Sequence, residues 1–347
     1  MIGVGIIGYG YWGPNLVRNF AEVAGCRVAA VSDTRAPQLA RVSARYPAVQ
    51  VYGDAVDLIA DPAVDLVVVA TPVSSHFDLA LAALKAGKHV LVEKPMTATT
   101  EQALRLIDEA DRRRLMLAVD HTFVYTGSVR KIRDLVASGD LGDIYYYDSV
   151  RVNLGLFQRD VNVIWDLAVH DLAILDHVLQ ATPIGVSATG MGHVAGEPEN
   201  IAYLTLMFPN HLIGHVHVNW LAPVKVRRTL IGGSHKMVVY DDLEPSEKVK
   251  VYDKGLTLNG ENGNGNGQAK YRLLVGYRAG DMWAPQLDMS EALGVEAKHL
   301  IGCIERGETP ISDGQAGLRV VRILEAASES IRNRGQLIEL GTPSCLA

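Results

Sequence analysis

Cysteine is scarce in this sequence, and the few that occur are not spaced for a shared task. Cys26, Cys303 and Cys345 are odd in number and form no CxxC pair. Disulfide frameworks and structural zinc sites both need paired or clustered cysteines, so neither is expected here. The scarcity fits a reducing compartment, and we expect a cytoplasmic protein.

The sequence also lacks an excess of positive charge and a long apolar run. Its formal net charge is −6, whereas nucleic-acid binding usually shows a basic patch or excess. No apolar run approaches the roughly 18 residues of a membrane span, and the chain opens on a strand-like run at residues 2–7 rather than on a signal peptide. We expect neither a nucleic-acid partner nor a membrane.

The apolar sequence that is present suffices for two cores in 347 residues. Strand and helix patterns alternate from residue 1 to about 120, which predicts a doubly wound parallel sheet of the Rossmann type that binds a dinucleotide. Strand-like runs without intervening helices follow, which predicts a mostly antiparallel sheet. We therefore expect an α/β protein with a Rossmann domain at residues 1–120 and a substrate-binding and oligomerisation domain at 121–347.

The first strand ends in a GxGxxG loop that contains Gly8, Gly10, Tyr11, Trp12 and Gly13. Glycines let the backbone turn tightly and approach a pyrophosphate, and the helix that follows offers free N–H groups at its start. A GxGxxG alone is weak evidence, but the strand before it and the helix after it strengthen the prediction. These five residues are expected to bind the cofactor.

Asp33 ends the second apolar run about 20 residues past Gly13, where the acid that binds the adenosine ribose is expected. A carboxylate there repels a 2′-phosphate, which favours NAD over NADP. Arg35 keeps NADP open, because a nearby arginine can pair with that phosphate. That Asp33 only caps the following helix is the alternative.

Polar residues follow two further buried runs. Thr71 and Pro72 end one, and Glu93 and Lys94 end the next, just before a proline. In open α/β sheets, ligands bind at the carboxyl ends of the strands, so these residues are expected to contact the cofactor and Lys94 also the substrate. His76 is a weaker candidate of the same kind, since packing or capping explains it as well.

Asp166 and His170 stand four residues apart on an expected helix, and so share one face. A carboxylate placed in this way orients an imidazole for acid–base chemistry, although such pairs are more often ordinary surface or helix-end features. Trp165 stands next to the pair, where it could stack on a nicotinamide or simply fill the core. The surrounding motifs have to decide.

Taken together, the motifs resemble the Gfo/Idh/MocA oxidoreductases, and the resemblance extends over essentially the whole chain. It rests on motifs in the family's order and at similar separations: residues 8–13, 70–72 (Ala-Thr-Pro), 93–95 (Glu-Lys-Pro), 166–170 and 310–314. It implies that Lys94 contacts the nicotinamide ribose and the reacting hydroxyl, and that Asp166 and His170 complete a catalytic trio. A homodimer or homotetramer is implied as well.

One departure from the family is visible. The family pattern often reads D-x-G-x-H-x-x-D, whereas this chain has Ala168 at the glycine and Ala173 at the final acid. Asp171 cannot be assumed to replace that acid. The departure puts one polyol contact in doubt and leaves the trio intact.

Residues before Trp165 resemble family members that act on nucleotide-linked sugars, including UDP-N-acetylglucosamine 3-dehydrogenases. Arg151, Asn153, Arg159 and Asn162 are donors suited to a diphosphate or to sugar hydroxyls, so we expect them to bind substrate. The alternative is that the arginines are solvated or paired with neighbouring aspartates.

Oxidation of a secondary alcohol needs a base near its oxygen and a rigidly held cofactor. We take His170 as the base, Asp166 as its support and Lys94 as the cation that stabilises the alkoxide, although Lys94 and His170 could exchange roles. A metal is not expected, since His215 and His217 share a strand face without a third ligand.

We therefore predict an NAD-dependent oxidoreductase that oxidises a secondary hydroxyl, at C-3, of a nucleotide-linked sugar, or reduces the matching ketosugar. Three alternatives stay open. They are an inositol or free-sugar dehydrogenase, an NAD-dependent glycosidase, and a protein that senses NAD or sugar without chemistry.

Overall fold

The computed structural model describes residues 1–155, 161–253, 255–258, 275–278 and 280–341. The chain forms two compact units, the first made of Met1–Thr126 with Met289–Glu325 and the second of Gly127–Asp288 with Ala326–Ala347. The first break lies close to the boundary expected near residue 120. Residues 289–325, however, belong to the first unit. The single boundary predicted near residue 120 placed these residues in the second domain.

The first unit is built on a six-stranded, wholly parallel sheet in the order β3-β2-β1-β4-β5-β6. This confirms the predicted doubly wound parallel sheet. Its strands are β1 (Ile2–Ile7), β2 (Cys26–Ser32), β3 (Gln50–Tyr52), β4 (Leu66–Val69), β5 (His89–Glu93) and β6 (Leu117–Asp120). Its helices are α1 (Gly13–Glu22), α2 (Ala36–Arg45), α3 (Ala55–Ala60), α4 (Val73–Lys85), α5 (Thr100–Arg113), η1 (Thr122–Tyr125), α9 (Ala292–Arg306) and the first part of α10 (Gly314–Arg332).

Apolar packing explains why α9 belongs to this unit. Leu16 and Phe20 of α1 share one buried cluster with Leu293, Leu300 and Ile301 of α9. Burial of a large apolar side chain stabilises by about 1.5–3 kcal/mol. Several such side chains together outweigh the entropic cost of bringing α9 back to α1 from far along the chain. The loop after α9 adds to the sheet as well, because the N–H of Val119 donates to the carbonyl of Ser312 at 2.8 Å.

The second unit is built on a nine-stranded sheet in the order β16-β13-β12-β11-β7-β10-β9-β8-β17. Among the described strands of this sheet, only β7 and β10 pair parallel. The other neighbouring strands pair antiparallel, as predicted. Its strands are β7 (Ile144–Leu154), β8 (Gly185–Met191), β9 (Ile201–Met207), β10 (Ile213–Asn219), β11 (Leu221–Gly233), β12 (Met237–Asp241), β13 (Val249–Tyr252), β16 (Met282–Trp283) and β17 (Ile338–Glu339). Its helices are α6 (Gly127–Ala137), the π-helix η2 (Ile164–Ala168), α7 (Val169–Leu179) and the end of α10.

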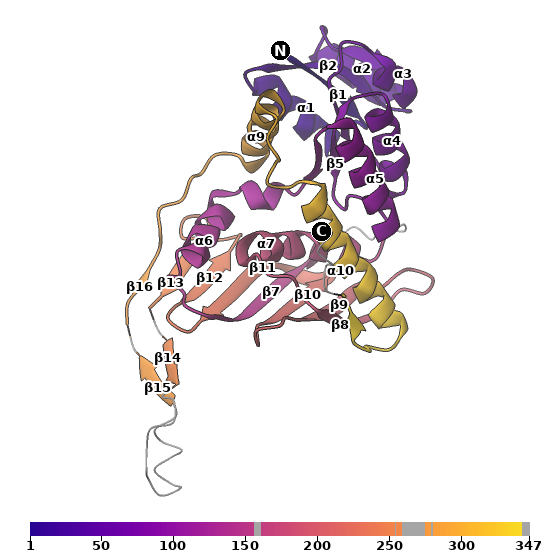
Figure 1. The fold of residues 1–347 in the computed structure, drawn as a ribbon. Coiled ribbons are helices and arrows are strands. Elements are labelled where there is room, and N and C mark those ends of the chain that lie inside the picture. The colour runs from indigo at the N-terminus through magenta and orange to yellow at the C-terminus, as the bar shows by residue number, and fades with distance from the viewer. Residues whose placement is uncertain (156–160, 254, 259–274, 279, 342–347) are drawn as a thin grey trace, which may run out of the picture. The chain divides into compact units, whose positions relative to one another are not determined.

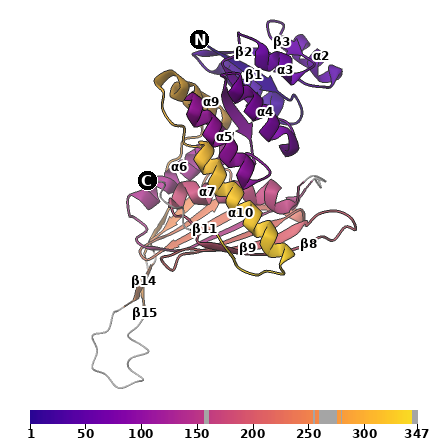
Figure 2. The ribbon, with the colours of Figure 1, turned by 45° about the vertical axis from the view of Figure 1, so that its right-hand side comes forward.

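The helices of the second unit lie on one face of its sheet (Figures 1 and 2). On that face the hydroxyl of Tyr147 in β7 donates to the carbonyl of Asp171 in α7 at 3.1 Å. Near the other end, Ser330 of α10 accepts from the N–H of Ala188 in β8 at 2.8 Å. The opposite face carries no helix among the described residues of the unit (Figures 1 and 2).

Strand β11 begins at Leu221 and pairs with β7 on both sides of a register shift between Leu221 and Val226. The Asn/Gly stretch at residues 259–267 lies outside the described residues. The strands beside it, β14 (Gly255–Leu258) and β15 (Val275–Arg278), pair antiparallel.

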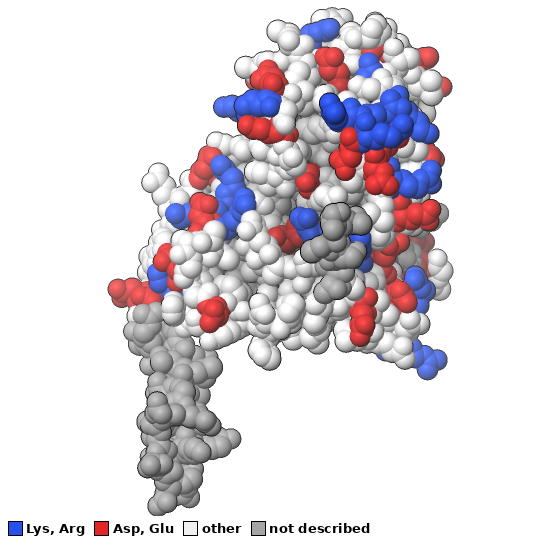
Figure 3. All heavy atoms as spheres, viewed as in Figure 1, with Lys and Arg blue, Asp and Glu red and all other residues white. Residues whose placement is uncertain are grey.

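Charged side chains of both signs lie next to one another on the face seen in Figure 3. Among the ion pairs of the described residues, Glu109 on α5 binds both Arg112 and Arg113. Within the described part of the chain, no helix is both long and apolar enough to cross a membrane.

Candidate active site

The glycine-rich loop has the shape that close approach of a phosphate requires. Gly8 has φ +101°, and a Cβ there would lie 2.3 Å from the carbonyl oxygen of Ala70. A Cβ on Gly13 would lie 2.2 Å from the carbonyl oxygen of Gly8. A Cβ on Gly10 would lie 3.5 Å from its nearest neighbour, a nitrogen of Arg35. A side chain there would therefore meet no clash, and the glycine leaves open space. The first and last glycines therefore shape the loop, and the middle one leaves room for a ligand.

The aromatic residues of the loop point in different directions. Tyr11 is 92% exposed. Trp12 instead donates its indole N–H to Asp120 Oδ2 at 3.0 Å, a contact that ties the loop to the end of β6.

Asp33 is fixed where the ribose acid was expected. It is 6% exposed, and its Oδ2 accepts from the N–H of Tyr9 at 2.8 Å. The guanidinium of Arg35 donates to both oxygens, each at 2.9 Å. Burial alone would raise the pKa of Asp33, but these hydrogen bonds outweigh it and lower the pKa, so the carboxyl is ionised near neutral pH.

Thr71 and Pro72 lie at the carboxyl end of β4, and Pro72 is the residue that precedes α4. His76 sits in the first turns of α4 and is 1% exposed. Its ring nitrogens lie 2.8 Å from the carbonyl of Thr71 and 2.9 Å from that of Pro95. Burial lowers its pKa, so the neutral ring donates to one of these carbonyls and links the two loops.

Lys94 follows β5 directly, at the same edge of the sheet where β1 and β4 end in Gly8 and Thr71. The strands are parallel, so their carboxyl ends share one edge, which is where such sheets bind ligands. The bond from Lys94 to Pro95 is cis. The backbone N–H of Lys94 donates to the side chain of Glu93 at 3.2 Å.

Asp166 of the second unit lies in the π-helix η2, where the sequence had predicted ordinary α-helix before α7. Its Oδ2 accepts from the indole N–H of Trp220 at 3.0 Å. His170 lies on the first turn of α7 and is half-buried. Single π-turns are rare and occur often at functional sites, so the irregular turn marks this segment.

The residues around Asp166 are held by contacts within the second unit. Asn162 accepts from the N–H groups of Ile164 and Trp165, and its amide donates to Glu199 at 3.0 Å. The indole N–H of Trp165 donates to Ser328 at 2.9 Å. Asn153 is half-buried on β7, and Arg159 lies outside the described residues.

Arg151 is buried beneath α7 and bound to Asp171. Its Nε and Nη2 donate to the two carboxylate oxygens at 2.7 and 3.2 Å, and the side chains are 4% and 3% exposed. Ser149 adds a third hydrogen bond to Asp171 at 2.8 Å. Asp171 is thus the partner of an arginine, so it does not stand in for the family's missing acid.

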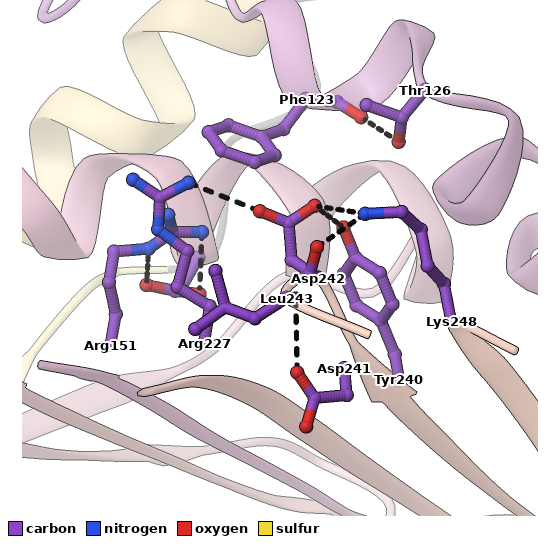
Figure 4. Close-up of polar contacts among 10 residues, drawn as sticks. Phe123, Thr126, Arg151, Arg227, Tyr240, Asp241, Asp242, Leu243 and Lys248 are labelled. Atoms are coloured by element: carbon purple, nitrogen blue, oxygen red, sulfur yellow. Dashed lines mark hydrogen bonds and ion pairs between the residues drawn. The ribbon is translucent and has the colours of Figure 1, made fainter. Parts of the chain in front are cut away.

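A second arginine lies beside this pair. Arg227 on β11 is directly opposite Arg151 across the strands, and it donates to Asp242 at 3.1 Å (Figure 4). Tyr240 and Lys248 also bind Asp242. The two neighbouring arginines are therefore each neutralised by an aspartate of their own, with Lys248 as an additional cation.

No group of three or more His, Cys, Asp and Glu side chains in the described part of the chain is placed to hold a metal ion. The pair singled out in the sequence, His215 and His217, lies instead against Tyr203, whose ring stacks on that of His217 at 4.4 Å. His215 contacts Asp148 at 3.3 Å.

Three residues of these surroundings were not found from the sequence: Asp120, Glu296 and Trp220. Asp120 and Glu296 join Glu93 in a buried acidic cluster considered below. A signal for Glu296 does exist, because it stands among Leu293, Ala297 and Leu300 on the buried face of α9, where a charged residue is out of place. Trp220 carries no such signal, since a tryptophan at a strand end reads as core.

A parallel sheet with a glycine-rich loop, the ionised Asp33 and a lysine at its carboxyl edge is the arrangement of a dinucleotide-binding Rossmann domain. The chain belongs to the Gfo/Idh/MocA family. Residues 2–121 match its model for the oxidoreductase family's NAD-binding Rossmann fold, and residues 129–239 match its model for the C-terminal domain.

Several relatives extend over nearly the whole chain. The uncharacterized oxidoreductase YdgJ of Escherichia coli is 28% identical over 97% of this chain and 98% of its own. The UDP-N-acetylglucosamine 3-dehydrogenase of Acidithiobacillus ferrooxidans is 28% identical over 91% and 93%. A solved structure of that enzyme, GnnA, aligns with a TM-score of 0.79 at 26% identity, covering 96% of this chain and 99% of that one. The myo-inositol 2-dehydrogenase of Thermotoga maritima is 24% identical over 95% and 96%.

Proposed function

We propose that the protein oxidises a secondary hydroxyl, at C-3, of a nucleotide-linked sugar with NAD, or reduces the matching ketosugar. The observation that carries the proposal is Lys94 at the carboxyl end of β5, on the same sheet edge as the glycine-rich loop. A cation at that edge can stabilise negative charge that develops on a substrate oxygen.

The residues present fit a dinucleotide. Gly8 and Gly13 shape the loop, Gly10 leaves space beside it, and the ionised Asp33 can accept from ribose hydroxyls. A carboxylate in this place repels a 2′-phosphate, which supports NAD over NADP. NAD supplies the hydride acceptor when it is bound.

The chain's own residues handle the proton. We assign His170 to take the hydroxyl proton, with Lys94 stabilising the alkoxide, or the reverse order. Asp166 is held by Trp220 in the π-helix that leads into α7, so its carboxylate has a fixed direction from which to orient His170. The residues that we also assign to the cofactor are Trp165, Thr71, Pro72 and Glu93, with Tyr11 and Trp12 of the loop. His76 is left out, because both of its ring nitrogens are held by backbone carbonyls.

Two features of α7 support a nucleotide-linked sugar over a free polyol. Asp171 is committed to Arg151 and Ser149, and Ala173, which stands at the family's final acid, is a buried side chain without polar atoms. A polyol would therefore miss one carboxylate contact. Asn153, Asn162 and Arg159 remain the proposed substrate donors, whereas Arg151, which the sequence also suggested, is buried against Asp171 and is not kept. The similarity to the UDP-N-acetylglucosamine enzyme supports this class.

The test is turnover. Purified protein is incubated with NAD⁺ and, separately, UDP-N-acetylglucosamine, a dTDP-hexose, myo-inositol and glucose, and NADH formation is followed. We expect a nucleotide sugar to give the highest kcat/KM and Lys94→Ala to abolish turnover while NAD⁺ still binds. Wild-type activity in Lys94→Ala would refute the catalytic assignment, and mass spectrometry of co-purified small molecules checks the substrate independently.

The same assay separates the alternatives. Equal or better turnover of myo-inositol or glucose would favour a free-sugar dehydrogenase. Consumption of a glycoside without net NADH would indicate transient oxidation during glycoside hydrolysis. Binding of NAD⁺ and sugar without turnover by the wild type would indicate a sensor.

We further propose that a second copy of the chain covers the open face of the large sheet, in a homodimer or homotetramer. The face exposes apolar side chains, including Tyr203, Met207 and Ile213. It also contains a hollow of about 470 Å³, lined largely by the apolar side chains Val150, Val226, Leu230, Met237 and Val239. Light scattering should give a multiple of 37.6 kDa, and Met207→Glu should reduce it towards the monomer; a monomeric wild type would refute the proposal.

We propose a cytoplasmic location on the chemistry of the thiols. Cys26 and Cys303 are both free and buried, which suits a reducing compartment. Fractionation of the source cells, followed by immunoblotting, tests the location.

A further inference from the structure

Three acidic side chains meet at the carboxyl edge of the first unit's sheet. Glu93 and Asp120 are register partners at the ends of β5 and β6. Glu296 reaches them from α9 and is completely buried. Both glutamates lie close enough to Asp120 for a hydrogen bond between the carboxyl groups.

A hydrogen bond between two carboxyl groups exists only if one of them carries a proton. Asp120 already accepts from the indole of Trp12 at 3.0 Å, and from the N–H and hydroxyl of Thr122 at 3.2 and 2.5 Å. In contrast, Oε1 of Glu93 and both oxygens of Glu296 face no donor among the described residues. Asp120 is thus equipped to be the anion, and the two glutamates to be the acids that donate to it.

The surroundings favour the same distribution of protons. Burial, followed by the charge of Asp120, raises the pKa of both Glu93 and Glu296 well above the ordinary value, although Lys94 opposes this at Glu93. Glu93 is only half-buried as a residue, but its Oε1 is inaccessible. The protonated form of Glu93 is therefore stabilised by the contact with Asp120 as well as by burial.

The other titratable groups that face the cluster are His121, Tyr125 and Lys94. His121 is 3% exposed, and neither ring nitrogen has a partner in the described part of the chain. Burial lowers its pKa to about 4, and burial raises that of Tyr125, with Glu296 adding to the rise. Both are neutral at pH 7, which leaves Asp120 as the anion and Lys94 as the cation.

We propose that Glu93, Asp120 and Glu296 are positioning residues that keep one negative charge and two protons beside Lys94. The single charge on Asp120 attracts the ammonium group of Lys94, while the protonated glutamates fix Asp120 from both sides. Were all three ionised, the buried edge would hold a triple negative charge that Lys94 alone could not balance. The protonation of the two glutamates depends only on residues of the first unit, whereas its effect on turnover rests on the proposed function.

The protons can be tested without any substrate. Infrared spectra of the NAD-free protein at pH 8 should show the C=O band of protonated carboxylic acids. Glu93→Gln and Glu296→Gln should each remove about half of it. Glu109→Gln is the matched control, because Glu109 is paired with Arg112 and Arg113, which lower its pKa. Absence of the band, or a band unchanged in both cluster variants, would overturn the proposal.

The positioning role is tested with UDP-N-acetylglucosamine and NAD⁺. Asp120→Asn should lower kcat by about 10–100-fold, as loss of a supporting partner does elsewhere, with a smaller change in the KM for NAD⁺. Glu296→Ala should lower kcat more than Glu296→Gln, since only glutamine keeps a donor for Asp120. Glu296→Gln should also shift the alkaline limb of the pH profile to higher pH.

The two assays fail separately. An infrared band that behaves as expected, with pH profiles unchanged in every cluster variant, would refute positioning and leave the protons established. Lack of turnover by the wild type with any tested sugar would count against the proposed function, while the infrared result would still decide whether the cluster holds its protons.

Discussion

Removal of one member of the Arg151–Asp171 pair should destabilise the second unit severely. The two side chains are 4% and 3% exposed and share hydrogen bonds of 2.7 and 3.2 Å. Arg151→Met leaves Asp171 buried with Ser149 as its remaining side-chain donor in the described part of the chain, and Asp171→Leu leaves a buried guanidinium. The loss expected on breaking a buried pair from one side is about 3–5 kcal/mol.

The double variant gives the sharper result. Arg151→Met with Asp171→Leu removes both charges at once, and replacement of a buried pair by apolar groups is often close to neutral. We therefore expect the double variant to be more stable than either single one. The coupling free energy in the double-mutant cycle should be about 3 kcal/mol or more.

Urea unfolding measures these values. In a Trp12→Phe background the remaining tryptophans, at positions 165, 220 and 283, all lie in the second unit, so their fluorescence reports on it. With a slope near 2 kcal/mol per M, each single variant should lower the midpoint by about 1.5–2.5 M. Lys250→Met is the control, because its partner Glu247 is 56% exposed and such pairs contribute under about 1 kcal/mol. Additive losses in the cycle would refute the reasoning.

Three further outcomes are expected. Gly10→Ala should unfold like the wild type but lose NAD affinity in a fluorescence titration, whereas Gly13→Ala should also lose stability, because its Cβ would lie 2.2 Å from a carbonyl oxygen. Arg35→Ala should weaken NADP binding about tenfold with little change for NAD, since it removes the cation suited to a 2′-phosphate. His121 has a pKa of about 4 in the folded chain and about 6.5 in the unfolded chain. The unfolded chain therefore takes up a proton first as the pH falls. The free energy of unfolding is not reduced by this residue above about pH 6.5, and it falls by about 1.4 kcal/mol per pH unit between about pH 6.5 and 4. His121→Asn should flatten that slope in urea titrations. Burial also lowers the pKa of His177 to about 4, but His177 is only half-buried, so His177→Asn should flatten the slope less.

Much of the first unit was predictable because its signals are local. A buried run such as Leu66–Val69, a glycine-rich turn and a capped helix each declare themselves within a few residues. Thr99 caps α5 in this local way, since its side chain accepts from the N–H of Gln102, three residues on, at 3.2 Å. The carboxyl edge of the sheet then follows from the parallel order, which gathers Gly8, Thr71 and Lys94 without any knowledge of side chains.

The features that could not be predicted from the sequence depend on residues that lie far apart along the chain. Arg151 and Arg159 both looked like surface donors, yet Arg151 is buried because Asp171, on a later helix, neutralises it. The π-turn around Asp166 has no signature in the local pattern, which reads as ordinary helix. Glu296 stands almost 180 residues beyond Asp120 along the printed sequence, so their contact cannot be inferred from spacing.

The return of residues 289–325 to the first unit determines when that unit can be completed during synthesis. The ribosome delivers β1 to β6 early, but α9 emerges only after eight of the nine strands of the large sheet, all except β17, have been made. Until then the apolar side of α1 at Leu16 and Phe20 lacks its cover, and the carboxyl edge lacks its third acid. A chain cut after residue 126 should therefore bind NAD poorly and aggregate, although it contains the complete glycine-rich loop and Lys94.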